Sequence, residues 1–218
     1  MEFELNPWLE QFTAAVSRAF PERVVCIGLQ GSRGRGEAGP ESDIDMVVIL
    51  DRLEYGDLAR YREAVAQLPH RELLCGFVSG REELLAWEPS DLFTFCHDTC
   101  PILGDLEFLC GRFGRADAER AVWTGLCGIY HGCVHNSLHE RDRDLLAGLF
   151  KSAVFTLQTK HFLETGRFVR RHRELAEALT GEEREIVRRA LAFRTGERPD
   201  LDQDGELLFR WCGRLLKG

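Results

Sequence analysis

The sequence lacks the long apolar segments that would place this chain of 218 residues in a membrane. No stretch approaches the roughly 20 consecutive apolar residues that a membrane-spanning helix needs. The first four residues include two glutamates and show neither the basic nor the apolar region of a secretory signal peptide. We therefore expect a cytoplasmic protein that does not bind membranes.

Basic residues are also too few to give the chain a positive charge. The sequence has 28 lysines and arginines against 36 aspartates and glutamates, and its net charge is −8. Proteins that bind nucleic acid usually carry a basic excess, because their affinity depends on neutralising phosphates. The charge therefore argues against nucleic acid as a partner, and activity on RNA ends is the function that it favours least.

Cysteine pairs at metal-binding spacing are absent as well. The eight cysteines include no C-x-x-C pair, which is the usual spacing of a structural zinc site. Cys26 and Cys75 lie inside apolar runs, where cysteine behaves as a small buried hydrophobic residue. We therefore expect buried free thiols and no structural zinc.

The pattern of expected elements divides the chain near residue 114. The first part alternates helical and strand patterns, which predicts a sheet covered by helices. Its expected helices cover residues 7–20 and 57–68. Its expected strands cover residues 24–29, 44–50 and 73–78. The second part has helical patterns separated by short Thr-Gly breaks, which suit an antiparallel bundle. We predict an α/β domain over residues 1–114 and a helical domain over residues 115–218.

The segment from Gly28 to Leu50 carries the strongest functional pattern. It begins as an expected strand, continues into a glycine-rich turn that contains Gly31 and Ser32, and returns as a second strand. Glycines keep a turn free of side chains and leave backbone N–H groups accessible, which suits a phosphate. Ser32 adds a hydroxyl donor, and Arg33 and Arg35 add positive charge, so the turn is a candidate phosphate site.

Asp43 and Asp45 stand two residues apart where the second strand begins. Side chains alternate between the faces of a strand, so both carboxylates are expected on one face, roughly 6–7 Å apart at Cα. Two such carboxylates repel each other unless a cation lies between them, and Mg²⁺ is commonly bound by one or two carboxylates together with substrate phosphates. The Gly-Ser turn and the aspartate pair are each common, and their combination is far more specific.

The segment resembles the nucleotidyltransferases of the DNA polymerase β superfamily, whose signature is Gly-Ser, about ten further residues and Asp-x-Asp on a strand. Gly31, Ser32, Asp43 and Asp45 match this signature. The glycine-rich turn is similar to that of small bacterial members, and the two-domain layout is similar to that of the aminoglycoside nucleotidyltransferases. The resemblance implies a small mixed sheet with helices, followed by a C-terminal helical bundle.

The resemblance also implies an activity. In the family, Gly-Ser holds the phosphates of a nucleoside triphosphate, and the two aspartates bind Mg²⁺ or Mn²⁺. A nucleoside monophosphate, with ATP as the expected donor, then moves to an acceptor hydroxyl and pyrophosphate leaves. We therefore expect Gly31, Ser32 and Arg33 to bind nucleotide, and Asp43 and Asp45 to hold the metal and act in catalysis. The pattern leaves a small molecule and a protein open as acceptors.

One position departs from the family pattern. The family usually places a third carboxylate on the following strand, and here the centre of that strand holds Cys75 and Gly76. Glu72, at the entry of the strand, is one candidate for the base that deprotonates the acceptor. Glu140 or Asp144 of the helical domain is another. The alternative is a nucleotide-binding or regulatory module of the same fold with weak or no catalytic activity.

The helical domain is expected to complete the site, because a turn and two aspartates at a sheet edge form an open shelf that cannot exclude water. The polar residues of that domain that could line the resulting cleft are His131, His135, Glu140, Asp144, Lys151 and Lys160. Its histidines His131, His135 and His139 follow Cys127 at helical spacing. Such a stripe drifts by about 20° every seven residues, so its four members cannot all bind one metal ion.

Overall fold

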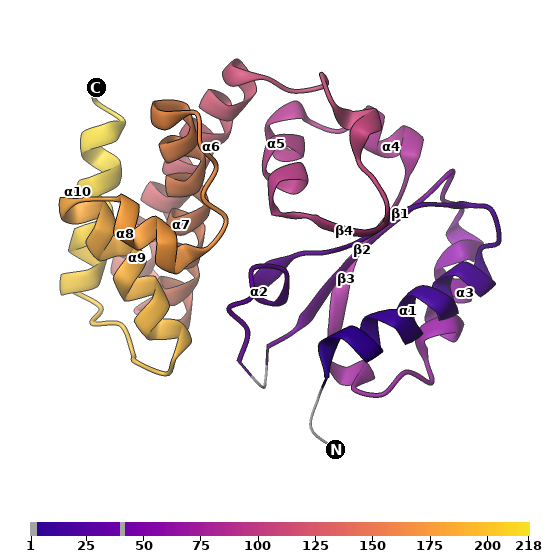
Figure 1. Cartoon of the computed structure of the whole chain (residues 1–218). Helices are drawn as coiled ribbons and strands as arrows, with labels where there is room; N and C mark the ends of the chain where they lie inside the picture. Colours follow the sequence, from indigo (N-terminus) through magenta and orange to yellow (C-terminus); the bar gives the residue numbers. More distant parts are fainter. Residues whose placement is uncertain (1–3, 40–41) are drawn as a thin grey trace. The chain divides into compact units, whose positions relative to one another are not determined.

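The computed structural model describes residues 4–39 and 42–218. The chain divides into two compact units, Met1–Arg112 and Phe113–Gly218, and each unit has a hydrophobic core (Figure 1). Of the helices in the described ranges, none combines the length and apolar character needed to cross a membrane.

The first unit is built on a mixed sheet of four strands. In chain order they are β1 (Val24–Leu29), β2 (Ile44–Leu50), β3 (Leu74–Gly80) and β4 (Cys100–Gly104). Their order in space is β3-β2-β1-β4; β1 is antiparallel to both neighbours, whereas β2 and β3 are parallel. The predicted mixed sheet is confirmed, and β4 is a strand that the sequence pattern did not predict.

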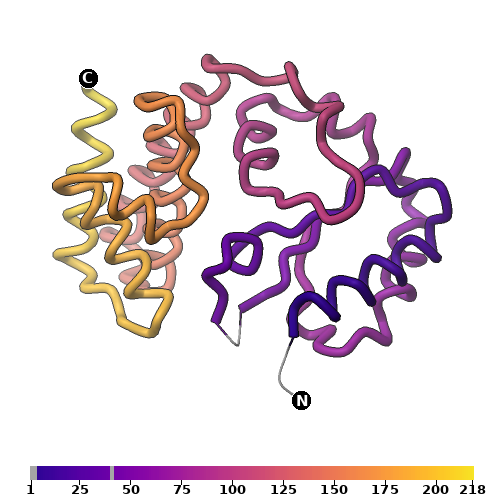
Figure 2. The backbone as a smooth tube through the Cα atoms, viewed as in Figure 1, coloured from indigo at the N-terminus to yellow at the C-terminus, as the bar shows by residue number. Residues whose placement is uncertain are grey.

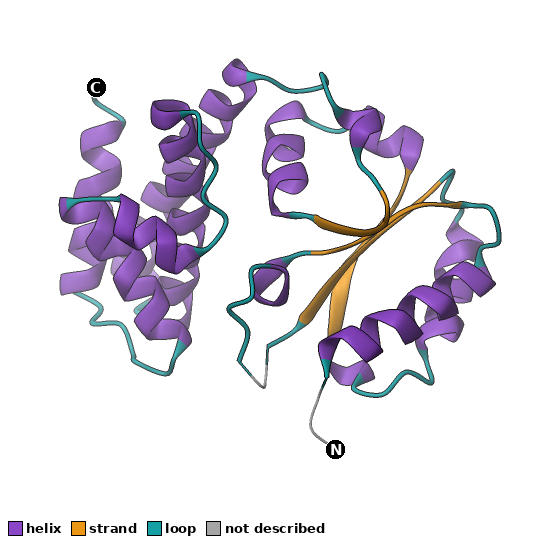
Figure 3. Ribbon diagram, in the orientation of Figure 1, coloured by secondary structure: helices purple, strands orange, loops and turns teal. Residues whose placement is uncertain are grey.

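Helices cover both faces of this sheet (Figure 3). They are α1 (Leu5–Ala19), α2 (Gly31–Gly34), α3 (Tyr55–Val65), α4 (Arg81–Leu85) and α5 (Pro89–Asp98), with 3-10 turns at Arg71–Leu73 and Glu107–Leu109. Helices α1 and α3 lie on one face, and α4 and α5 lie on the other. Helix α1 forms because Trp8, Phe12 and Val16 recur every four residues, and all three are buried in the core.

Strand β2 presents its alternate residues to opposite faces of the sheet. Those that join the core beneath α1 are Ile44, Met46, Val48 and Leu50. Asp45 and Val47 therefore face the side of α5. Val47 is paired in register with Phe77 of β3, whose ring lies 5.4 Å from that of Phe95 in α5. Asp45 thus lies on the α5 face, near the end of the sheet where β2 begins.

The second unit consists of helices and turns over its described residues. They are α6 (Arg115–His135), a π turn (Asn136–Glu140), α7 (Arg143–Thr165), α8 (His172–Ala178), α9 (Gly181–Arg194) and α10 (Gln203–Leu215). Helix α7 supplies the centre of the core with the apolar stripe Leu146, Phe150, Ala153, Val154 and Leu157. It ends at Gly166, whose φ of 73° is the left-handed conformation common after helices. The predicted C-terminal helical part is confirmed.

Candidate active site

Helix α2 is a single turn that follows β1 directly and leads back toward β2 (Figure 2). Its first residue, Gly31, has a φ of 65°, which favours glycine. A β-carbon added at Gly31 would overlap the carboxylate of Asp45. The backbone N–H of Gln30 also donates a hydrogen bond of 2.8 Å to the carbonyl of Asp45. The structure therefore brings the Gly-Ser turn and Asp45 into contact.

The two aspartates differ in their surroundings. Asp43 is exposed in the segment just before β2, whereas Asp45 is the second residue of β2 and is partly buried. Both lie near the guanidinium of Arg33: burial lowers the pKa of Arg33, and the charges of Asp43 and Asp45 act in the opposite direction. Two carboxylates are thus gathered beside the Gly-Ser turn.

Oxygen ligands of this kind suit Mg²⁺, which accepts one or two protein carboxylates and takes its other ligands from water and phosphate. Across residues 4–39 and 42–218, no group of three or more histidine, cysteine, aspartate or glutamate side chains is arranged to hold a metal ion. A divalent cation at Asp43 and Asp45 would therefore need oxygens from substrate or solvent, which is the arrangement expected when a nucleotide carries the metal in.

Arg33 holds the chain that leads into β2. Its side chain is buried, and its Nε donates hydrogen bonds to the carbonyls of Ser42 at 3.0 Å and of Asp43 at 3.2 Å. A third hydrogen bond, of 2.7 Å, joins Nη2 to the carbonyl of Ser42. The guanidinium therefore anchors the backbone that carries Asp43. That Arg33 also binds nucleotide stays a prediction.

Two residues at the end of α5 contact the turn and were missed by the sequence analysis. The Gly31 N–H donates to Oδ2 of Asp98 at 3.2 Å, so this amide already has an acceptor. Arg35 donates to the same carboxylate, with Nη1 at 3.0 Å from Oδ1. Thr99 accepts a hydrogen bond of 2.8 Å from the Gln30 side chain. Because 67 residues separate Gly31 from Asp98, no local pattern pointed to this contact.

Strand β3 places Cys75 in register with Asp45. The thiol of Cys75 is exposed, so the expectation that this cysteine is buried was wrong; β3 is an edge strand, and its first half is open. Glu72 lies ahead of β3 in an exposed 3-10 turn, where its Oε1 is 3.7 Å from Nδ1 of His70. Its role as a base stays a prediction.

The candidate acidic residues of the second unit lie at the junction of α6 and α7. Glu140 ends the π turn, and its Oε1 lies 3.2 Å from Nε2 of His135. Asp144 is exposed in the first turn of α7, where its backbone N–H donates to Oδ1 of Asp142 at 2.6 Å. His135 also lies between His131 and His139, with ring centroids 6.3 and 5.2 Å away. The predicted histidine stripe therefore runs from α6, with His131 and His135, into the π turn, with His139.

The two candidate lysines of α7 differ in exposure and in ion pairing. Lys151 is exposed. Lys160 is held by Glu164, at 2.6 Å, and by Glu183 of α9, at 3.2 Å. Burial lowers the pKa of Lys160, but its hydrogen bonds with both glutamates outweigh this effect and leave the pKa raised. Lys160 is therefore occupied within its own unit, and Lys151 is the more accessible cation.

Comparison with known proteins agrees with the signature in the first unit. Residues 9–93 match the family model described as a nucleotidyltransferase domain. Among solved structures, the chain is similar to the spectinomycin adenyltransferase AAD(9) from Enterococcus faecialis, crystallised with ATP and spectinomycin. The TM-score is 0.65 at 15% sequence identity, and the match covers 99% of this chain and 100% of that chain. No curated protein shows significant sequence similarity to this one.

Proposed function

The first unit carries a nucleotidyltransferase domain of the DNA polymerase β-like superfamily, and we propose that the chain transfers a nucleoside monophosphate from ATP to an acceptor hydroxyl. The observation that carries this proposal is the contact of the Gly31 turn with Asp45. A phosphate held by the turn would lie beside the two carboxylates, so one site can hold both the nucleotide and the cation that neutralises it.

We assign the metal-binding role to Asp43 and Asp45. A bound Mg²⁺ would supply charge stabilisation at the α-phosphate and at the leaving pyrophosphate. The residues of the chain position the reactants: Gly31 and Ser32 orient the phosphates, and Arg33 holds the backbone of Asp43 in place. In the reaction, the acceptor oxygen forms a bond to the α-phosphorus while the bond to pyrophosphate breaks, and the acceptor proton passes to a base.

Three acidic residues are candidates for the base that accepts the acceptor proton. Glu72 is the acidic residue that immediately precedes β3, and Glu140 and Asp144 are the proposed alternatives in the second unit. We also propose Lys151, rather than the paired Lys160, as the cation of that unit that contacts the phosphates. We further propose that residues 1–114 and 115–218 form two domains.

A small polar molecule with several hydroxyls is the acceptor class that we propose first. The support is the overall similarity, across both units, to an adenyltransferase that was crystallised with ATP and spectinomycin. The net charge of −8 agrees with a cationic small molecule better than with a polyanion such as RNA. A protein hydroxyl is the other acceptor that the chemistry permits.

A second candidate function is favoured by one observation. The residue of β3 in register with Asp45 is Cys75, and the strand carries no carboxylate along Leu74–Gly80. A protein of this fold without a base could bind nucleotide and regulate a partner without turnover. Such a module would be stabilised by ATP and Mg²⁺, by about 2.7 kcal/mol at a hundredfold excess over its Kd, yet would release no pyrophosphate.

One experiment separates the two functions. The protein is incubated with ATP, Mg²⁺ and pooled aminocyclitols, aminoglycosides and peptide hydroxyls, and mass spectrometry searches for acceptors that gain one adenylyl group. Transfer that a chelator abolishes, with pyrophosphate formed in equal amount, supports the enzyme. Stabilisation by ATP without any adenylylated product supports the regulatory module. Neither stabilisation nor product would contradict both proposals.

A further inference from the structure

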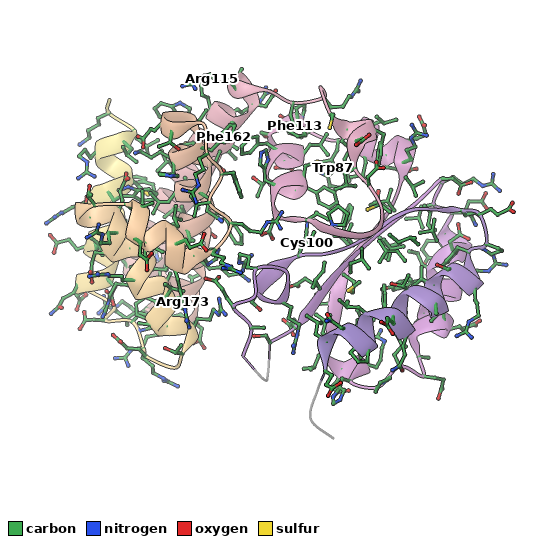
Figure 4. All side chains as sticks on the ribbon, viewed as in Figure 1. Trp87, Cys100, Phe113, Arg115, Phe162 and Arg173 are labelled. Atoms are coloured by element: carbon green, nitrogen blue, oxygen red, sulfur yellow. The ribbon has the colours of Figure 1, made fainter. Side chains whose placement is uncertain are left out.

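The end of α5 and the start of β4 contact the Gly-Ser turn through three consecutive residues. Asp98 accepts the Gly31 N–H, Thr99 accepts the Gln30 side chain, and Cys100 donates from Sγ to the carbonyl of Gly34 at 3.2 Å. Figure 4 labels Cys100 at this position. The turn is therefore bounded by β2, through Asp45, and by this segment, which we call the clasp (Asp98, Thr99 and Cys100).

The clasp is anchored by a buried ion pair. Arg35, which follows α2, is 5% exposed, and Asp98 is 9% exposed. Arg35 Nη1 lies 3.0 Å from Oδ1 and 3.3 Å from Oδ2 of Asp98, so one carboxylate accepts both from the arginine and from the Gly31 amide. Burying a charge is costly unless it is paired and hydrogen-bonded. The pair therefore holds the two ends of the turn, Gly31 and Arg35, to one group on α5.

Thr99 connects the clasp to Gln30, the residue that directly precedes the turn. Thr99 is 2% exposed, and its Oγ1 donates to the carbonyl of Phe95 at 2.6 Å while it accepts from Gln30 Nε2. Gln30 in turn donates its backbone N–H to the carbonyl of Asp45. A continuous set of hydrogen bonds thus runs from α5 through Gln30 to the strand that carries a proposed metal ligand.

We propose that Asp98, with Arg35 and Thr99, is a positioning residue that sets the nucleotide-binding geometry of the Gly-Ser turn. This inference rests on the proposed nucleotide site. Displacement of a binding group by about 1 Å can reduce a rate by about a hundredfold. Loss of the clasp should therefore weaken nucleotide binding beyond any effect on the stability of the fold.

The second unit offers a matched control. Asp204 is 4% exposed, accepts from Nε and Nη2 of Arg189, each at 2.9 Å, and accepts the backbone N–H of Asp200 at 2.7 Å. It therefore has the same kinds of partner as Asp98, an arginine and a backbone amide, but they lie in the other unit. Asp204→Asn removes the same charge in a comparable setting.

The experiment measures binding of the non-transferable analogue α,β-methylene-ATP with Mg²⁺ by calorimetry, together with Tm, for the full chain and its variants. Asp98→Asn should raise Kd about tenfold or more. Thr99→Val should also raise Kd, and it should lower Tm as well, because the buried hydroxyl makes two hydrogen bonds. Asp204→Asn should lower Tm and leave Kd unchanged. An unchanged Kd in both Asp98→Asn and Thr99→Val would overturn the proposal.

A multiple variant separates positioning from packing. Arg35 forms ion pairs with Asp98 and, at 3.5 Å, with the buried carboxylate of Glu37, so all three charges are removed together in Arg35→Met with Glu37→Gln and Asp98→Leu. Replacing a whole buried ion network by uncharged side chains is often neutral or stabilising. We expect Tm near that of the unaltered protein and a Kd still raised about tenfold, because the turn is no longer tied to α5 at Gly31 and Arg35 and loses its fixed geometry. Recovery of both Tm and Kd would overturn the proposal. If the unaltered protein binds no analogue, the proposed function fails before the clasp is tested.

Discussion

Gly31 lies against the carboxylate of Asp45, so any residue with a β-carbon at position 31 would displace the turn or the carboxylate. Gly31→Ala should lower adenylyl transfer by about a hundredfold or more, because the methyl group displaces Asp45 or the turn. The left-handed φ of 65° adds about 1–2 kcal/mol of strain. Steady-state kinetics and urea unfolding measure the two effects separately.

The control for this substitution is Gly56→Ala in α3. No atom lies within 4 Å of the added β-carbon there. Alanine is the better helix former, so stability should rise slightly while transfer stays unchanged. Near-normal activity in Gly31→Ala would mean that the contact with Asp45 has no part in catalysis.

Arg33 connects the turn to the backbone that precedes β2. Replacing it with methionine leaves the carbonyls of Ser42 and Asp43 without their donor, so Asp43 should lose its fixed position. We expect the Mg²⁺ concentration for half-maximal transfer to rise about tenfold or more. Titration of activity with Mg²⁺ measures this shift. An unchanged metal requirement in Arg33→Met would show that Asp43 does not depend on this anchor.

Asp57 forms an ion pair with Arg23 outside the candidate site, and this pair should make the stability of the protein depend on pH. The hydrogen bonds from Arg23, at 2.9 and 3.0 Å, lower the pKa of Asp57 to about 2, and the Glu54 N–H adds to this effect. A lowered folded pKa stabilises the protein above the unfolded value of about 3.9, and this stability is lost as pH falls from about 4 to about 2.

Asp57→Asn should therefore reduce the free energy of unfolding at neutral pH, and its difference from the unaltered protein should shrink below about pH 4. Urea unfolding at about pH 7 and about pH 3 provides the comparison. A difference that stays constant between these two conditions would contradict the assignment to Asp57.

Cys75 offers a chemical probe of the site. It is exposed and in register with Asp45, whereas burial raises the pKa of Cys26 to about 11 and that of Cys133 and Cys212 to about 12. Iodoacetamide should therefore alkylate Cys75 well before these three and inhibit transfer. ATP with Mg²⁺ should slow the inhibition, and Cys75→Ser should resist it.

Two further exposed cysteines, Cys110 and Cys127, serve as controls for the alkylation. Substituting them with serine should leave the inhibition as it was. Inhibition that persists in Cys75→Ser would place the sensitive thiol elsewhere and remove the support for Cys75 beside the site.

The sequence predicted the elements whose signals are local. Strands β1 and β2 are short runs rich in β-branched residues, and α1 has a large apolar residue at every fourth position. The burial of these elements could therefore be predicted. Strand β4 could not, because Pro101 and its largely exposed neighbours show no alternation; it forms through pairing with β1. The state of such a segment is decided by its partner.

The same distinction holds in the site. The Gly-Ser and Asp-x-Asp pattern identified Gly31 and Asp45 from 15 residues of sequence, 31–45. The partners of the arginines could not be predicted, since Arg35 pairs with a residue 63 positions away. The contacts of Arg33 with the backbone carbonyls of Ser42 and Asp43 could not be predicted either, and its binding of nucleotide stays a prediction.

Pyrophosphate release from ATP, with an acceptor found in the screen, tests most directly whether Asp43 and Asp45 support metal-dependent transfer. Asp43→Asn and Asp45→Asn keep the shape of the side chain and remove its charge. We expect pyrophosphate release to fall by about a hundredfold or more in each variant, with Tm close to that of the unaltered protein. Near-normal pyrophosphate release by either folded variant would contradict this role of the two aspartates.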